Sequence, residues 1–358
     1  MFGLLAGVAL GGCAAVLGVE DLQPGRVTAL EDGGARDAPV PPGPDAGVTC
    51  RTEALCVPRV LAERVGVRSL GVGERSASWL LGTKAEGIAL DAPDASPVSV
   101  AQPFLETSVV TFEAVVRVGR TSFVTGAFAG DQAWIGSQEG IDGPWKSSAS
   151  FGPRLVAQTV VGLPGFHVVA LVGGGTTRLR RCAVPTLNGC GDVNTGWADI
   201  GASALLGLRL AASDATLLLM GTTRVGVGAL DACVPERCTE TTTRVLDAIP
   251  EPTAVAGNAG KAFVGSARGT VTAVRISDRA TTELLALDAP VVQLAVTRST
   301  LYVLDTVGWL SACTLPVSGP CTGADRYLLT TEPVDAFAAD ALDVVAQTRS
   351  GRIVRLPP

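Results

Sequence analysis

The sequence predicts an all-β fold, and three observations support this prediction. Beyond about residue 50, short apolar runs alternate with turns rich in Gly, Asp, Ser and Thr, which is the pattern of β-strands. No helical period is sustained: residues 52–65 and 334–349 have the Ala and Leu content of helices, but periodicity alone does not decide such short runs. The third observation is that the strand pattern repeats along the chain.

The repeat is clearest between Pro290 and Leu329, where four apolar runs are separated by turn signals. Looser versions recur, and the second apolar run of each version contains one of seven anchor residues. These anchors are Trp79, Phe123, Val168, Leu218, Phe263, Tyr302 and Val344. Their mean spacing is about 44 residues, the length of a four-stranded propeller blade. The sequence therefore predicts a β-propeller of seven four-stranded blades, with six to eight as the range and two β-sandwich domains as the alternative.

Turn residues support the repeat in its last units. Gly269 and Gly308 each lie six positions after their anchors, where a glycine provides the positive φ of a tight hairpin between second and third strands. Gly87 and Gly351 lie at similar offsets. Because the last unit has only three strands, we expect a strand from residues near 50–60 to complete the ring, which removes exposed sheet edges.

The N-terminal segment predicts export and lipidation. Residues 1–12 are apolar and too short to span a bilayer, which takes about 20 residues, so they fit a signal peptide. The segment ends in Leu10-Gly11-Gly12-Cys13, which resembles the bacterial lipobox, and this resemblance implies cleavage before Cys13 and lipidation of its thiol. No Lys or Arg precedes the apolar core, so either translation starts upstream or the segment is an ordinary apolar N-terminus.

The domain boundaries follow from composition. The residue after the cysteine is Ala14, not the Asp that resembles an inner-membrane retention signal, so we expect the outer membrane. Residues 13–49 carry the lipid site and then a Pro-, Gly- and Asp-rich stretch that cannot bury enough apolar surface to fold, which predicts a disordered tether. Residues 50–358 form the predicted propeller domain.

The remaining cysteines predict disulfide bonds. Besides Cys13, the chain has eight cysteines in four close pairs. These pairs are Cys50 and Cys56, Cys182 and Cys190, Cys233 and Cys238, and Cys313 and Cys321. The last three pairs occupy the same place in the unit, between the third and fourth strands. Free thiols are disfavoured in an oxidising compartment, the spacings do not fit CxxC metal or redox motifs, and the chain has one histidine, so local disulfides are expected.

Other patterns give no catalytic or cofactor site. His167, the single histidine, lies in an apolar strand, and no GxSxG elbow accompanies it, so we interpret it as structural. The glycines of 173–175 lack the Lys of a phosphate loop and indicate a turn. Residues 192–199 have oxygen ligands at alternate positions, but Ser203 stands where a calcium loop has its Glu, which favours a plain Asx turn. We predict no metal and no cofactor.

Charge and aromatic residues limit the partners. The net charge is −6, with 25 Arg and 3 Lys and no basic stripe, which argues against nucleic-acid binding. Most of the five tryptophans are expected to pack between blades. Trp145 follows Asp142-Gly143-Pro144 in what reads as a loop, so we take it as a candidate partner-binding residue.

With its lipobox, tether, repeat and paired cysteines, the chain resembles bacterial β-propeller lipoproteins, including in general plan the propeller lipoprotein of the outer-membrane barrel-assembly machinery. The resemblance implies a monomeric, lipid-anchored envelope propeller that binds a protein or glycan without catalysis, on the periplasmic side or at the cell surface. The alternative is an envelope enzyme, a glycan lyase or hydrolase, with carboxylates and arginines in the central channel. Fold analogy alone does not identify the partner.

Overall fold

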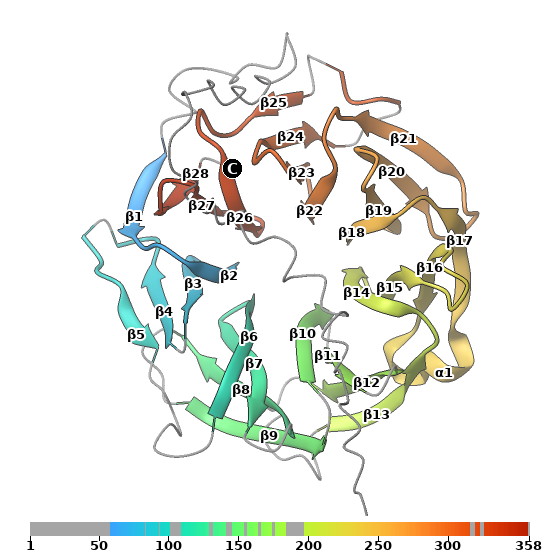
Figure 1. Cartoon of the computed structure of the whole chain (residues 1–358), viewed down its shortest axis with the longest axis horizontal. Helices are drawn as coiled ribbons and strands as arrows, with labels where there is room; N and C mark the ends of the chain where they lie inside the picture. Colours follow the sequence, from blue (N-terminus) through green and yellow to red (C-terminus); the bar gives the residue numbers. More distant parts are fainter. Residues whose placement is uncertain are drawn as a thin grey trace, which may run out of the picture. The chain divides into compact units, whose positions relative to one another are not determined.

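The fold was analysed in a computed structural model. It describes residues 58–356 except 83, 93, 101–108, 129–131, 141–144, 154–155, 164–165, 174–175, 184–196, 316–318 and 323–325. The predicted signal peptide, the lipidation site Cys13, the tether and the pair Cys50 and Cys56 lie outside these residues. Seven antiparallel sheets of four strands each follow one another around a ring (Figure 1). The domain is a seven-bladed β-propeller, not a pair of β-sandwiches.

Each of the first six blades uses four consecutive strands. Blade 1 consists of β2 (Val67–Gly73), β3 (Ser76–Leu81), β4 (Lys84–Ala89) and β5 (Val98–Val100). Blade 2 consists of β6 (Val109–Val118), β7 (Thr121–Phe128), β8 (Gln132–Glu139) and β9 (Trp145–Pro153). Blade 3 consists of β10 (Val156–Leu163), β11 (Phe166–Gly173), β12 (Thr176–Ala183) and β13 (Trp197–Ser203). Blade 4 consists of β14 (Leu206–Ser213), β15 (Thr216–Thr222), β16 (Gly228–Cys233) and β17 (Thr243–Ile249). Blade 5 consists of β18 (Pro252–Asn258), β19 (Lys261–Ser266), β20 (Thr270–Arg275) and β21 (Thr281–Ala286). Blade 6 consists of β22 (Val291–Val296), β23 (Thr300–Asp305), β24 (Leu310–Thr314) and β25 (Arg326–Leu328). A 3₁₀ turn (Pro235–Arg237) and the short helix α1 (Cys238–Thr241) interrupt blade 4.

Blade 7 closes the ring as expected. It contains β26 (Val334–Ala339), β27 (Val344–Thr348) and β28 (Arg352–Leu356), and its fourth strand is β1 (Arg59–Glu63) from the other end of the domain. In the register of this closure, Val60 lies opposite Val354. The two segments that periodicity left undecided between helix and strand form strands joined by turns, with no helix in their described residues.

All seven anchors lie in second strands, and each is buried. Five of them face the following blade, as Phe263 and Tyr302 do in their apolar clusters. Trp79 packs instead with Val345 of the preceding blade, and Val344 packs with residues of its own preceding blade. The alignment of these two anchors with the other five was therefore wrong by one residue. A shift of one residue moves a strand side chain to the other face of the sheet.

The hairpin glycines are mostly where the repeat predicted them. Gly269, Gly308 and Gly351 have φ of 80°, 101° and 84° and lie in turns between second and third strands. Gly87 is an exception, because it lies within β4 opposite Ser78. The corresponding turn of blade 1 uses Gly82, with φ of 60°.

The core lies between blades. Six apolar clusters each join two neighbouring blades. The interface of blades 1 and 2 contains a buried polar network: Arg117 Nη1 donates hydrogen bonds to Ser122 Oγ (2.6 Å) and Ser78 Oγ (3.3 Å), and its Nε donates to Gly73 O (3.1 Å). Burial lowers the pKa of Arg117, and Glu74 partly opposes this shift.

The meander gives the ring two distinct faces. One face carries the blade-to-blade connections and the turns between second and third strands, and we call it the connection face. The other carries the remaining turns, including those with the cysteine pairs, and we call it the disulfide face. In Figure 1 the first strand of each blade lies innermost and the fourth lies at the rim.

Candidate functional site

Two of the predicted disulfides are confirmed. Cys233 is bonded to Cys238, and Cys313 is bonded to Cys321. Both bonds close turns between third and fourth strands, on the disulfide face. Cys182 is also disulfide-bonded, and Cys190, its predicted partner, lies outside the described residues.

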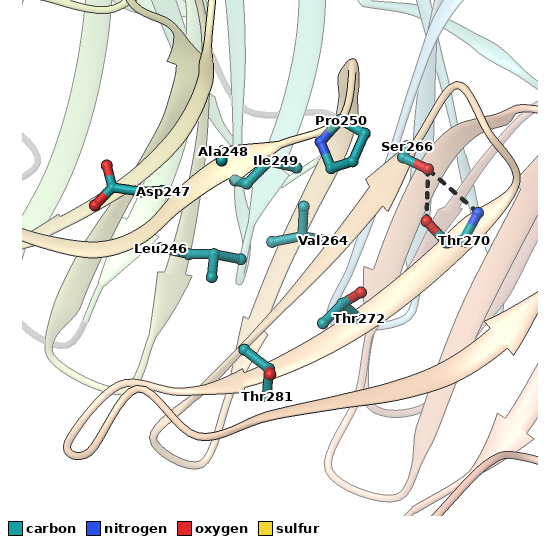
Figure 2. A pocket seen from close by; sticks show the side chains of 10 residues that line it. All are labelled: Leu246, Asp247, Ala248, Ile249, Pro250, Val264, Ser266, Thr270, Thr272 and Thr281. Carbon is teal, nitrogen blue, oxygen red and sulfur yellow. Dashed lines mark hydrogen bonds between the residues drawn. The ribbon is translucent and has the colours of Figure 1, made fainter.

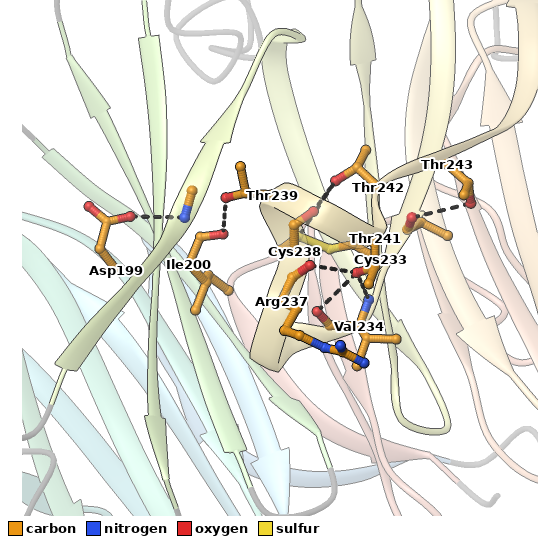
Figure 3. The surroundings of a disulfide bond; sticks show 12 residues. Asp199, Ile200, Cys233, Val234, Arg237, Cys238, Thr239, Thr241, Thr242 and Thr243 are labelled. Carbon is orange, nitrogen blue, oxygen red and sulfur yellow. Dashed lines mark hydrogen bonds between the residues drawn. A yellow bond between two sulfur atoms is a disulfide. The ribbon is translucent and has the colours of Figure 1, made fainter.

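Each closed turn also contacts the neighbouring blade. Thr239, next to Cys238, donates a 3.0 Å hydrogen bond from its hydroxyl to the carbonyl of Ile200 on β13, the rim strand of blade 3 (Figure 3). The backbone N–H of Cys321 in blade 6 donates a 2.7 Å bond to the carbonyl of Leu284 on β21, the rim strand of blade 5. We call such a turn, hydrogen-bonded to the rim strand of the preceding blade, a clasp.

The joint between blades 7 and 1 has the same kind of contact without a described disulfide. Arg59 of β1, the rim strand of blade 7, donates to the carbonyl of Ala92 in the turn after β4 (3.2 Å). Arg355 donates to the carbonyl of Leu90 (2.9 Å) and forms an ion pair with the buried carboxylate of Asp343.

Blades 4 and 5 lack such a clasp among the described residues. The turn between β20 and β21 folds back on its own blade: Arg275 pairs with Asp278 at 2.6 Å, and the N–H of Ile276 donates to the carbonyl of Gly260. The hydrogen bond from the N–H of Ala280, and then that from Arg275, lower the pKa of Asp278. A groove lies between the rims of blades 4 and 5, beside the apolar cluster that joins the two blades.

The groove has a volume of about 210 Å³ and two walls of different chemistry (Figure 2). Blade 4 contributes Leu246, Asp247, Ala248, Ile249 and Pro250, and blade 5 contributes Val264, Ser266, Thr270, Thr272 and Thr281. One wall is thus largely aliphatic and the other is mainly hydroxyl. At this size the groove holds a few side chains and is smaller than the pockets that enclose small-molecule ligands, which are about 300–1,000 Å³.

A bulge in β17 shapes the aliphatic wall. Gly228 pairs with Ile249 and Ala229 pairs with Asp247, so Ala248 is the extra residue. Ala248 has φ of 55°, a left-handed conformation that is unfavourable for a residue with a Cβ and that is often found at ligand-binding positions. The bulge lies in the wall of the groove, where Asp247, Ala248 and Ile249 are all lining residues.

Asp247, the charged residue of the groove lining, is paired with Arg244. Arg244 Nη1 donates to Asp247 Oδ1 at 2.6 Å, and Arg244 Nε donates to Asp231 Oδ1 at 2.5 Å. The bond to Asp231, with help from Asp247, raises the pKa of Arg244. On the other wall, the hydroxyls of Ser266 and Thr270 are hydrogen-bonded to each other at 2.7 Å. The lining suits the aliphatic side chains of an amphipathic segment, and it contains no aromatic side chain on which a sugar ring would stack.

The residues singled out from the sequence lie apart from the groove. His167 is buried in β11, with its ring edge-on to Phe123 at a centroid distance of 4.8 Å. Trp145 does not lie in a loop: it is the first residue of β9 and pairs with Gln138, directly after the predicted turn. Asp199 accepts a 2.9 Å hydrogen bond from the N–H of Gly201, which is an Asx turn. Residues 174–175 and 192–196 lie outside the described part.

The innermost strands carry few charges. Their exposed charged residues in the described chain include the carboxylates Glu113 on β6 and Asp335 on β26, which lie on blades separated by blade 1. Asp335 is paired with Arg349 at 3.4 Å. Over the described residues, no group of three or more His, Cys, Asp or Glu is arranged to hold a metal ion. In the same part of the chain, no helix has the length and apolar character needed to cross a membrane.

Solved structures with similar folds support the architecture. Human WBSCR16 matches with a TM-score of 0.54 and 10% identity, over 82% of this chain and 87% of that one. The computationally designed Ika8 protein matches with 0.52 and 13%, over 84% and 100%. Prp20p from Saccharomyces cerevisiae, described with its binding properties to Gsp1p and histones, matches with 0.52 and 9%, over 81% and 82%. Neither a protein-family model nor a curated protein sequence matches the chain.

Proposed function

We propose that this chain is a lipid-anchored propeller of the bacterial cell envelope that binds a partner protein without catalysing a reaction. The observation that supports binding is the groove between blades 4 and 5, which offers an aliphatic wall, a hydroxyl wall and a paired charge. Such a lining suits an extended polypeptide, whose backbone accepts and donates hydrogen bonds beside its apolar side chains. Prp20p, whose fold is similar, is described as binding Gsp1p and histones.

The envelope location has separate support. Disulfides persist in oxidising compartments, and two are formed within this domain. The lipobox-like Leu10-Gly11-Gly12-Cys13 would supply the anchor. We expect metabolic labelling with a palmitate analogue to mark the full chain and the Cys13→Ser variant to lose both the label and membrane association. A variant that stays labelled, or a wild type that is never labelled, would rule out this anchor.

The binding role is tested by crosslinking in the native cell, followed by mass spectrometry of the products. We expect one envelope protein to be recovered with the full chain. Its yield should be well above that with the double variant Leu246→Asp and Thr272→Asp, which places two carboxylates in the groove. Products that contain only glycan would show that the ligand is a sugar and not a protein. Recovery of no product under conditions that capture known envelope complexes would reject the binding role.

A further inference from the structure

Exposed aliphatic side chains gather on the connection face of blade 4. The described part of the chain has eight large apolar residues with high exposure, and three of them, Leu206, Val225 and Val227, belong to one small region. Val225 is 85% exposed and Val227 is 42% exposed. Single exposed apolar residues need no explanation, but a cluster on a soluble domain marks an interaction surface.

The turn that presents these residues is held in one shape. It runs from Thr223 to Val227 between β15 and β16, and three hydrogen bonds close it. The N–H of Thr223 donates to Val227 O at 2.8 Å, the N–H of Gly226 to Thr223 O at 2.9 Å, and the N–H of Val227 to Thr223 Oγ1 at 3.2 Å. A preorganised turn loses little conformational freedom when it binds.

This turn adjoins the groove. Val227 precedes Gly228, which pairs with Ile249 in the groove wall. At Gly228 the backbones are so close that a Cβ would lie 2.2 Å from Ile249 O and 2.6 Å from Pro252 Cδ. Leu206 lies at the base of the same turn, opposite Thr222. The exposed aliphatic residues and the groove therefore form one continuous surface.

The charges around this surface favour an acidic partner. Arg224 lies in the turn, and Arg268 lies in the corresponding turn of blade 5; both are exposed, and neither has an ion pair within the described residues. Two carboxylates lie nearby: Asp247 in the groove wall, which is paired with Arg244, and Glu251 in the connection between the two blades. Two unpaired cations here contrast with the net charge of −6 for the whole chain.

We propose that the connection face of blade 4, formed by Leu206, Arg224, Val225 and Val227 with the mouth of the groove, docks an extended aliphatic and acidic segment of a partner protein. This inference rests on the proposed binding function and specifies its surface and the chemistry of the partner. Aliphatic side chains of the segment pack on the two valines and in the groove, and its carboxylates lie near the arginines.

The test uses a photoreactive amino acid, p-benzoylphenylalanine, placed in the full chain in the native cell at position 225 or, as a control, at position 342. Leu342 is 47% exposed and lies between β26 and β27 on the disulfide face. We expect a crosslinked protein from position 225 alone. We also expect mass spectrometry to map the attachment to a peptide with aliphatic and acidic residues.

A charge reversal tests the arginines. Arg224→Glu with Arg268→Glu should reduce the yield at position 225 by about fivefold, because two exposed charge interactions are lost. Arg237→Glu with Arg298→Glu makes the same charge change on exposed residues of the disulfide face and should leave the yield unchanged. Equal yields with both double variants, or a basic attached peptide, would overturn the proposal.

The outcomes separate this surface from the function on which it rests. A partner captured at position 342 and not at 225 rejects this surface and keeps the binding function. Capture at neither position, together with no product from general crosslinking, rejects both. Thermal unfolding of each variant, followed by circular dichroism, checks that the exposed substitutions leave the fold intact.

Discussion

The indole Nε1 of Trp79 donates a 2.9 Å hydrogen bond to Glu86 Oε2, and the two residues lie opposite each other on β3 and β4. The same oxygen accepts a 2.7 Å bond from Arg64 Nε, just after the closing strand β1. The backbone N–H of Arg64 also donates to the carbonyl of Gly351 in blade 7. One carboxylate thus ties a buried tryptophan of blade 1 to the strand that closes the ring.

Glu86→Ala should lower the free energy of unfolding by about 2 kcal/mol, because it leaves the buried Trp79 N–H without an acceptor. Glu86→Gln keeps an acceptor and should lose less. Asp335→Ala removes an exposed ion pair with Arg349 and should change stability by less than about 0.5 kcal/mol. Urea unfolding followed by circular dichroism measures all three variants. An equal effect of Glu86→Ala and Asp335→Ala would contradict this role for Glu86.

The closing strand offers two adjacent residues with opposite environments. Leu61 is 9% exposed and packs with Trp79 and Ile353, whereas Val60 is 45% exposed. Leu61→Asp buries a carboxylate and should cost at least about 3 kcal/mol, while Val60→Asp should cost less than about 1 kcal/mol. Unfolding midpoints and size-exclusion profiles report the difference. Similar losses for both variants would mean that β1 contributes little to ring closure.

The disulfide in blade 6 should stabilise the domain through its short loop. Closing a loop of this length gives about 2–3 kcal/mol in the chain-entropy account. We expect Cys313→Ser with Cys321→Ser to unfold at a lower urea concentration than wild type. A reducing agent should lower the stability of the double variant less than that of wild type. If the reducing agent has the same effect on both, the disulfide in blade 6 is not a source of stability.

The clasp in blade 4 has a contribution that does not depend on its disulfide. Thr239→Val keeps the shape of the side chain and removes the hydroxyl that donates to Ile200 O, which should cost about 1 kcal/mol. Thr282→Val, on an exposed residue of β21, is the matched control. Hydrogen exchange should become faster in β13 and unchanged in β21. Unchanged exchange in β13 would show that the clasp does not hold this rim.

The sequence determined the architecture because a blade is a local unit: period, hairpin glycines and cysteine pairs all lie within about 44 residues of one another. The closing strand was predictable because the last unit lacked one strand. The face of the sheet on which Trp79 lies was not predictable, because apolar residues adjacent in sequence fill both faces of a second strand.

The candidate site was not predictable from the sequence for a related reason. The groove is lined by residues of β17, β19, β20 and β21, and no local residue pattern marks where strands of two blades meet. Ala248 reads as an ordinary strand residue, and its left-handed conformation appears only in the structure. Arg117 likewise reads as a surface residue in an alternating run, although it lies buried between blades 1 and 2.

His167 should make stability depend on pH. It is buried, its Nδ1 has no hydrogen-bond partner among the residues that the structure describes, and burial lowers its pKa to about 4, compared with about 6.5 in an unfolded chain. Between these values the unfolded state binds more protons, so this contribution to stability is present above about pH 6.5 and is lost as the pH falls toward 4. The loss should be about 3 kcal/mol.

Because carboxylates also titrate in this range, the prediction concerns the difference between wild type and His167→Leu. Urea unfolding from pH 4 to 7 should show a steeper decline for wild type. The chain has one histidine, so its single imidazole Cε1–H resonance reports the pKa of His167 directly. A resonance that titrates near pH 6.5 in the folded protein, with parallel stability curves for the two proteins, would show that the imidazole is accessible to water. It would also contradict the packing of His167 against Phe123.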